Sequence, residues 1–533
     1  MFSDGKIYMG LANGERVNVP LNMCNRHGLI AGASGTGKTI TMKVMAESFA
    51  DAGVPVFLCD IKGDVSGLAM AGAQNEGMEK RIDKFGIRGE FQYKPYSTCF
   101  WDVYGENGHP VRVTVSDMGP DLLSRILGLT EAQEGVLNIA FRIADDRGLL
   151  LLDLKDLKAL LNYLSDHREE FMNTYGNIAA QSVGGILRAL IPLESQGGDL
   201  FFGEPALNIF DWIRTDMYGK GMINLLDCVK LVHSPKLYAS FLLWMMAELF
   251  ERLPEAGDAD KPKLVFFFDE AHMLFSDAPK VLVQKIEQLV KLIRSKGVGI
   301  YFVTQSPGDI PDSVLAQLSN RVQHALRAYT PAEQKVVRAA ASSFRENPEF
   351  KTDDVITQLG VGEALTSFLD DQGIPSVVQY TKIICPQSLM APCDDSVRRT
   401  MMNADGMSKY DQMVDNDSAY EMLGREREKA AEEEKLAAER EKLEKEREEF
   451  EKQKAKEEEA ARKKQEREEE AARKKKEREE EAEKRKKERQ EEAEKKKKEA
   501  AAERRKAKIE SQLINAGGQI LKRGLLNTLF KKR

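Results

Sequence analysis

Glycine, lysine and threonine occur in one short run at a spacing that suits phosphate binding. The run is Gly32-Ala33-Ser34-Gly35-Thr36-Gly37-Lys38-Thr39, which fits the pattern G-x-x-x-x-G-K-[ST]. Its glycines let the main chain approach a phosphate with no side chain in the way. The Lys38 ammonium can reach the β- and γ-phosphates, and the Thr39 hydroxyl can ligate Mg²⁺. The run therefore predicts a nucleotide-binding loop.

Two carboxylates farther along the chain supply the chemistry that such a loop lacks. Leu264–Phe268 is a run of five apolar residues, typical of a buried strand, and Asp269 and Glu270 follow it directly. Asp269 could hold Mg²⁺ through water, and Glu270 could take a proton from a water that attacks the γ-phosphate. The alternative is a solvated acidic turn. Downstream of a phosphate loop, we favour the catalytic interpretation.

Polar residues also end two other apolar runs. Thr304-Gln305 ends the run that begins at Gly297, and Gln305 could contact the γ-phosphate or orient the water. An ordinary strand-end turn is the alternative. Asp60-Ile61-Lys62-Gly63-Asp64 closes another run, and the sequence leaves open whether it contacts the site or only forms a turn.

Hydrolysis of a triphosphate also needs positive charge near the transition state, and a neighbouring subunit often supplies an arginine. The candidates are Arg294, Arg321 and Arg327. We favour Arg321, which follows Asn320 where another strand should begin. A surface arginine is the alternative for each.

The apolar runs predict an α/β fold with a mostly parallel sheet, whose carboxyl edge collects ligands. The expected strands are 27–32, 54–60, 221–226, 263–269 and 298–305, and a helix is expected from Ile40 to Ala50. Between the second and third strands we expect a large helical insertion at about 105–215. A Thr130-to-Gln133 capping box opens one of its helices.

The chain divides into four zones by composition. We expect an ATPase domain over 1–390, a linker over 391–424, a charged helix over 425–508 and a basic amphipathic segment over 509–533. The formal net charge is −7, and the last two zones carry an excess of basic residues, so the body of the chain is acidic. An acidic body is a poor non-specific binder of nucleic acid over its outer surface.

The six cysteines form no C-x-x-C pair and are not spaced with histidines as zinc ligands. With no apolar segment ahead of the loop, we expect a cytoplasmic protein.

The charged zone repeats every 11 residues from Glu457, and acid-to-base pairs such as Glu459–Lys463 lie four residues apart. Leu436, Leu443 and Phe450 could seed a short coiled coil near 430–452. The rest is interpreted as a single solvated helix, with a nucleic-acid-binding arm as the alternative. For the final segment we expect docking on protein, with contact to a membrane surface as the alternative.

With these motifs assembled, the chain resembles the HerA/FtsK branch of P-loop ATPases and, within it, the YjgR-like family of HerA-like ATPases. The likeness covers about residues 5–390 and resumes at the C-terminal end. It is carried by Asp60-Ile61-Lys62-Gly63-Asp64, Phe100-Trp101-Asp102-Val103-Tyr104-Gly105, Met118-Gly119-Pro120, Leu127-Gly128-Leu129-Thr130-Glu131-Ala132-Gln133-Glu134-Gly135, Phe268-Asp269-Glu270-Ala271-His272, Thr304-Gln305-Ser306-Pro307 and Lys522-Arg523-Gly524-Leu525-Leu526.

The resemblance implies a RecA-like sheet, ATP with Mg²⁺, and a hexameric ring that uses arginines in trans. It also implies movement on, or remodelling of, double-stranded DNA. Carried onto this chain, the site residues are Lys38, Thr39, Asp269, Glu270 and Gln305, together with Arg321. Two alternatives remain: an ATP-switched scaffold whose long helix and basic end tether a partner, and a phosphoryl transfer to a substrate other than water.

Overall fold

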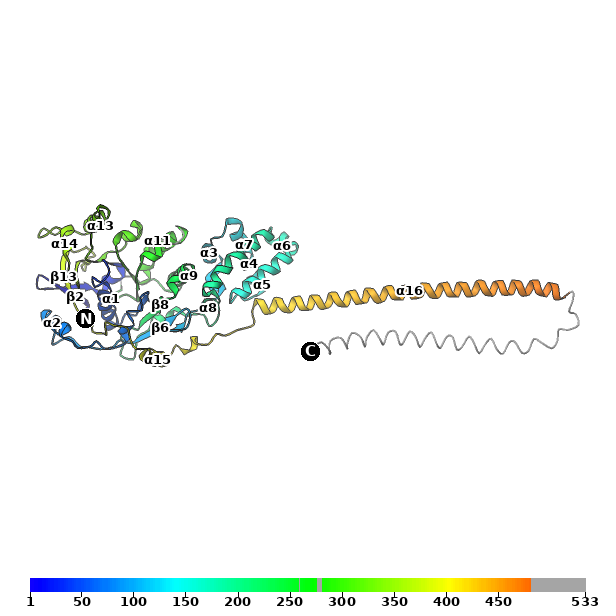
Figure 1. Cartoon of the computed structure of the whole chain (residues 1–533), viewed down its shortest axis with the longest axis horizontal. Helices are drawn as coiled ribbons and strands as arrows, with labels where there is room; N and C mark the ends of the chain where they lie inside the picture. The colour runs from blue at the N-terminus through cyan, green and yellow to red at the C-terminus, as the bar shows by residue number, and fades with distance from the viewer. Residues whose placement is uncertain (258, 276–279, 481–533) are drawn as a thin grey trace. The chain divides into compact units, whose positions relative to one another are not determined.

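The computed structural model describes residues 1–257, 259–275 and 280–480. The chain divides into two compact units, Met1–Glu428 and Lys429–Arg533. The first unit holds the β-sheet and the helices around it (Figure 1). Among the described residues, no helix is both long and apolar enough to span a bilayer. Every residue of the expected site falls in the first unit.

Parallel strands form the centre of a single 13-stranded sheet, in the order β11-β4-β10-β9-β5-β8-β6-β7. The strands are β4 Gly28–Ala31, β5 Val56–Asp60, β6 Thr98–Asp102, β7 His109–Pro110, β8 Ile223–Asp227, β9 Leu264–Phe268, β10 Val298–Thr304 and β11 Asn320–His324. The five strands expected from the sequence are β4, β5, β8, β9 and β10. The α/β fold with a mostly parallel sheet is therefore confirmed.

An antiparallel extension, which the sequence did not predict, continues the sheet beyond β11 in the order β11-β12-β13-β2-β1, with β3 paired to β2. Its strands are β1 Phe2–Ser3, β2 Lys6–Ala12, β3 Glu15–Pro20, β12 Glu363–Ser367 and β13 Gln379–Ile383. Apart from β2, a mostly apolar run of seven residues, these strands mix charged, amide or hydroxyl residues with apolar ones. Such a pattern does not stand out from turns in the sequence.

The apolar character of β9 follows from burial on both faces of the sheet. Leu264, Phe266 and Phe268 belong to one hydrophobic cluster, whereas Val265 and Phe267 belong to a second. Successive side chains of a strand point to opposite faces, so a strand covered on both sides must be apolar throughout. This pattern predicted a central strand, and β9 lies between β10 and β5.

Helices cover both faces of the sheet (Figure 1). Those outside the insertion are α1 Lys38–Asp51, α2 Glu76–Lys84, α9 Pro235–Arg252, α10 His272–Phe275, α11 Lys280–Ile293, α12 Asp312–Leu315, α13 Pro331–Ser342, α14 Thr352–Gln358 and α15 Asp395–Ala404. Met45 and Phe49 of α1 pack in one cluster, and Phe241 and Met245 of α9 pack in the other. The two helices therefore cover opposite faces.

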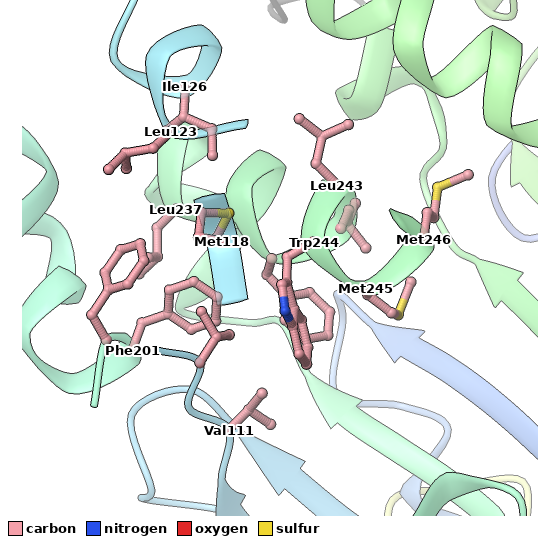
Figure 2. Packing of buried hydrophobic residues seen from close by; sticks show 14 of the residues in the cluster. Val111, Met118, Leu123, Ile126, Phe201, Leu237, Leu243, Trp244, Met245 and Met246 are labelled. Atoms are coloured by element: carbon pink, nitrogen blue, oxygen red, sulfur yellow. The ribbon is translucent and has the colours of Figure 1, made fainter. Parts of the chain in front are cut away.

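A group of helices occupies the segment where an insertion was expected. They are α3 Val115–Leu127, α4 Glu131–Arg147, α5 Leu154–Asp166, α6 Arg168–Tyr175, α7 Ala180–Leu193 and α8 Asp199–Phe201. The capping box of Thr130 and Gln133 is present at the start of α4. Figure 2 shows how the group is anchored, with Met118 and Leu123 of α3 gathered with Phe201 and with Trp244 of α9 in one buried cluster.

Residues 391–424 are part of the folded first unit, and the interpretation of this segment as a linker was wrong. The unit extends to Glu428. The Tyr410 side chain is 2% exposed, and its hydroxyl donates to the Asp211 carboxylate at 2.6 Å. Ala419 and Leu423 are buried in the same cluster as α9. The segment is rich in Asp and Met, and its few apolar anchors are too far apart to give a periodic signal.

Most of the charged zone is one helix, α16 Ala419–Glu480. Ion pairs four residues apart link Glu441 to Lys445 and Glu459 to Lys463, both at 2.6 Å. Leu436, Leu443 and Phe450 are exposed, so the short coiled coil stays a prediction that needs a second helix. The remainder of the 425–508 zone and the whole 509–533 segment lie outside the described residues.

The buried state of Tyr410 generates a prediction about stability. Replacing Tyr410 with Ala leaves a cavity and unpaired polar groups, and should cost about 3–5 kcal/mol of unfolding free energy. Tyr329→Ala is the control, because the Tyr329 side chain is 85% exposed, and its effect should stay within about 0.5 kcal/mol. Urea denaturation followed by circular dichroism measures both. Equal stability of the two variants would mean that the segment does not pack as described.

Candidate nucleotide-binding site

The Gly32–Thr39 loop connects the end of β4 to the start of α1, as the sequence predicted. Gly37 caps α1 with a φ of +115°, and a Cβ there would lie 3.2 Å from the backbone N of Gly362. A side chain at this position would be both strained and crowded. Because α1 begins at Lys38, the first N–H groups and the positive end of the helix dipole face the loop. This arrangement is suited to an anion.

The buried His324 ring of β11 supports the loop. The His324 Nδ1–H donates to the Glu363 carbonyl at 2.9 Å, and Nε2 accepts from the Thr41 hydroxyl at 2.8 Å. Burial lowers the pKa of His324 to about 4, so the ring is neutral at pH 7, as these two bonds require. A Cβ at Gly32 would lie only 2.5 Å from the His324 Cβ. No sequence pattern marks His324 as a residue of this site.

Lys38 is folded onto its own loop. Its ammonium donates to the Gly32 carbonyl at 2.6 Å and to the Ala33 carbonyl at 3.1 Å. The side chain is buried, and burial lowers the pKa of Lys38, although the nearby Glu270 and Asp269 carboxylates work against this shift. Phosphate oxygens are stronger partners for an ammonium than peptide carbonyls. Lys38 is therefore positioned to turn from these carbonyls to a phosphate.

The carboxyl ends of β4, β10 and β9 meet at one edge of the sheet. In the parallel register Ala31 pairs with Thr304, and Phe302 pairs with Phe268. Asp269, at the end of β9, therefore lies at the same edge of the sheet as the loop, one strand away from it across β10. Burial and the adjacent Glu270 carboxylate raise the pKa of Asp269 to about 6. A buried carboxylate with a raised pKa is stabilised by a bound cation.

Glu270 has an unusual backbone for a residue with a side chain. Its φ of +45° lies in the left-handed region, which costs about 1–2 kcal/mol for a non-glycine residue. Such strain is concentrated at functional sites. The turn directs the Glu270 carboxylate to three neighbours: Lys62 Nζ at 2.5 Å, Gln305 Nε2 at 3.3 Å and His272 Nδ1 at 3.3 Å.

The Lys62 contact resolves a question that the sequence left open. Asp60 forms the turn, because its carboxylate accepts the backbone N–H groups of Gly63, Asp64 and Val65 at 2.7–3.2 Å. Lys62 at the tip of this turn reaches the site. Burial opposes ionisation of Glu270, but the Lys62 ammonium, together with Gln305 and His272, outweighs burial and lowers the pKa of Glu270 below its usual value.

The arginine candidates lie in different settings. The Arg321 guanidinium donates to the carbonyls of Leu315, Leu318 and Ser343 within its own chain. Arg327 donates to the Thr357 carbonyl at 2.7 Å. These bonds position both side chains within the fold of the chain, and a role in trans for Arg321 stays a prediction.

The residues present fit a nucleoside triphosphate with Mg²⁺. Backbone N–H groups of the loop and the Lys38 ammonium suit phosphate oxygens. The Thr39 hydroxyl and the Asp269 carboxylate are hard oxygen ligands of the kind that Mg²⁺ prefers. Glu270 and Gln305 lie in contact, with Gln305 Nε2 donating to a Glu270 oxygen at 3.3 Å.

Removal of the Lys38 ammonium should weaken nucleotide binding. A charge-assisted hydrogen bond is worth about 1.5–3 kcal/mol, so Lys38→Ala should raise the Kd for a non-hydrolysable ATP analogue with Mg²⁺ about 10- to 150-fold. Lys80→Ala is the control, because Lys80 lies on the exposed face of α2 and pairs with Glu76. Isothermal titration calorimetry measures both. A wild-type Kd for Lys38→Ala would mean that the loop does not hold the phosphates.

Several solved structures share part of this architecture at low identity. The bacterial conjugative coupling protein TrwB is 14% identical, with a TM-score of 0.47, over 73% of this chain and 92% of that one. VirB4 of Thermoanaerobacter pseudethanolicus is 16% identical, with a TM-score of 0.46, over 72% of this chain and 97% of that one. Likenesses this distant carry no argument about individual residues or ligands.

Two curated relatives are described as the DNA double-strand break repair helicase HerA. The one from Sulfolobus acidocaldarius is 20% identical over 384 residues, which cover 68% of this chain and 67% of the relative. The one from Sulfurisphaera tokodaii is 21% identical over 362 residues, which cover 65% and 64%. The chain thus spans about two thirds of each relative. The profile of the helicase HerA-like C-terminal family matches residues 8–533, and the chain belongs to this family of P-loop ATPases.

Proposed function

We propose that the chain hydrolyses ATP in a Mg²⁺-dependent reaction and couples hydrolysis to translocation on, or remodelling of, double-stranded DNA. The observation that carries the ATPase proposal is the register of β4, β10 and β9. That register brings the Gly32–Thr39 loop and the Asp269-Glu270 pair to one edge of the sheet. In this proposal the loop binds the phosphates, and Glu270 at the same edge activates the attacking water.

Each side chain has a distinct role in the proposed reaction. Lys38 leaves the loop carbonyls and binds β- and γ-phosphate oxygens. Thr39 and, through water, Asp269 would hold Mg²⁺, which neutralises charge on the transferred phosphoryl group. Glu270 accepts a proton from a water molecule while the water oxygen attacks the γ-phosphorus. The bond between the γ-phosphorus and the bridging oxygen then breaks, and that oxygen leaves with ADP. Gln305 orients that water.

The ion pair between Lys62 and Glu270 sets the resting state of this site. A carboxylate bonded to an ammonium at 2.5 Å is a weak base, because the positive charge stabilises its ionised form. A triphosphate carries several negative charges and would attract the Lys62 ammonium away from Glu270. Nucleotide binding would therefore release the base at the moment when it is needed.

The DNA part of the proposal rests on kinship. The two curated relatives are described as DNA repair helicases, and the family is HerA-like. The body of the chain is acidic, so contact with DNA would need a local basic surface, such as the inside of a ring. We therefore propose a homo-oligomer, with a hexameric ring as the expected form and Arg321 as the candidate arginine in trans.

An ATP-switched scaffold is the second candidate, favoured by α16. This helix has 62 described residues with no sustained apolar seam, so it would act as a spacer of about 1.5 Å per residue. Together with the basic 509–533 segment it could tether a protein partner or contact a membrane surface. The scaffold predicts basal ATPase activity that does not respond to nucleic acid.

Neutralising the proposed base should separate binding from turnover. Glu270→Gln keeps the shape of the side chain but cannot take a proton, so hydrolysis should fall by about 10²–10⁴-fold. ATP binding should persist, and unhydrolysed nucleotide should stay on the protein after gel filtration. Glu169→Gln is the control, because Glu169 is exposed on α6. Normal hydrolysis by Glu270→Gln would show that another group activates the water.

A panel of nucleic acids separates the two candidate functions. ATP hydrolysis by the full chain is measured without nucleic acid and with duplex DNA, single-stranded DNA or RNA, and the mass in solution is measured by light scattering. The DNA proposal predicts a several-fold stimulation by duplex DNA and a hexameric mass. Lys38→Ala reports contaminating activity. Equal rates under all four conditions would favour the scaffold and contradict translocation.

A further inference from the structure

A buried cluster outside the nucleotide site brings together a thiol, an imidazole and a carboxylate. Cys99 lies on β6, His109 on β7, and Asp405 directly after α15. The ligand atoms of these three residues all lie within 4.8 Å of one another. The Cys99 Sγ–H donates to an Asp405 oxygen at 3.2 Å, and His109 Nε2 lies 3.1 Å from both Asp405 oxygens. The side chains of His109 and Asp405 are 1% and 4% exposed.

A second carboxylate orients the imidazole. His109 Nδ1 lies 2.6 Å from the Asp411 carboxylate, which is itself half exposed. This bond fixes the ring so that Nε2 points at Cys99 and Asp405. In proteins, a histidine that ligates a metal commonly donates its other N–H to a carboxylate, which holds the ring in place and raises its basicity. The arrangement of Asp411 and His109 is of this kind.

We propose that Cys99, His109 and Asp405 bind a divalent transition-metal ion of the zinc class, with Asp411 orienting His109. A thiolate, an imidazole and a carboxylate are a donor set that favours Zn²⁺ over Mg²⁺ or Ca²⁺. Zinc–ligand bonds of about 2.0–2.3 Å in a tetrahedron place ligand atoms about 3.3–3.8 Å apart. The two contacts to Asp405, at 3.1–3.2 Å, are close to this spacing, and Cys99 Sγ and His109 Nε2 lie within 4.8 Å of each other.

The exchange of protons for metal balances. A carboxylate oxygen lies within hydrogen-bond distance of each ring nitrogen of His109, so without metal we assign a proton to each nitrogen and the thiol proton to Cys99. The ion replaces two of these protons, the one on Cys99 Sγ and the one on His109 Nε2, and both go to solvent. Because a divalent cation replaces two protons, the net charge of the site, with the ion included, does not change. The buried Asp405 carboxylate therefore incurs no new charge imbalance.

The site would attach the 405–411 segment to the edge of the sheet. Its ligands come from β6, β7 and the residues after α15, which are far apart in the sequence. Tyr410, between Asp405 and Asp411, is buried against Trp101 of β6, with ring centroids 5.6 Å apart. A metal ion would strengthen this attachment, and with it the start of α16, which begins at Ala419.

Cobalt is a suitable probe, because Co²⁺ bound to a thiolate gives a charge-transfer absorption band in the near ultraviolet. The full chain, with reduced thiols and no nucleotide or zinc, is titrated with Co²⁺ and then with Zn²⁺. We expect a band that saturates at one equivalent and disappears as Zn²⁺ displaces Co²⁺. The thermal unfolding temperature should rise on addition of Zn²⁺.

Matched variants identify the ligands. Cys99→Ser should abolish the band while retaining the far-ultraviolet circular dichroism of the wild type. Cys393→Ser, at another buried cysteine, should keep the band. Asp411→Asn leaves the three ligands in place and should weaken metal affinity about 10- to 100-fold. A missing band in the wild type, or an unchanged band in Cys99→Ser, would overturn the proposal and leave a proton-bonded cluster.

Discussion

The parallel register of β4, β10 and β9 is the constraint on which the site depends. Each strand is buried on both faces, so its residues are almost entirely apolar and its polar groups are confined to the ends. The strand ends then present the Gly32–Thr39 loop, Gln305 and the Asp269-Glu270 pair along one edge. The positions of the polar site residues are therefore set by the points at which the apolar runs of these three strands end.

At that edge of the sheet, the charged side chains of the site are paired with other protein groups or buried in the absence of a ligand. Lys38 is held by two carbonyls, and Glu270 is held by Lys62. Asp269 is buried with a raised pKa. Each of these groups gains from the arrival of a triphosphate and a cation, because opposite charges then replace weaker partners. In the proposed reaction, nucleotide binding and activation of the base would be linked through the same few side chains.

The sequence predicted the parts of the fold that have strong local signals. The apolar runs and the glycine loop located β4, β9 and β10, because burial on both faces leaves an unbroken pattern. For the turn that contains Lys62, the sequence left contact with the site open, because the contact between Lys62 and Glu270 depends on how the ends of β5 and β9 lie relative to each other. Tyr410 and the His109 cluster were not predicted. Their partners lie about 200–300 residues away in the sequence, and single cysteines, histidines and tyrosines carry no periodic signal.

The most direct test of the account is a structure of the full chain with Mg²⁺ and a non-hydrolysable ATP analogue. In that structure, Lys38 Nζ should leave the Gly32 and Ala33 carbonyls and lie about 2.7–2.9 Å from phosphate oxygens. Asp269 should contact the metal through water, and Lys62 should separate from Glu270. An analogue bound away from the Gly32–Thr39 loop, with the Lys62–Glu270 pair intact, would contradict it.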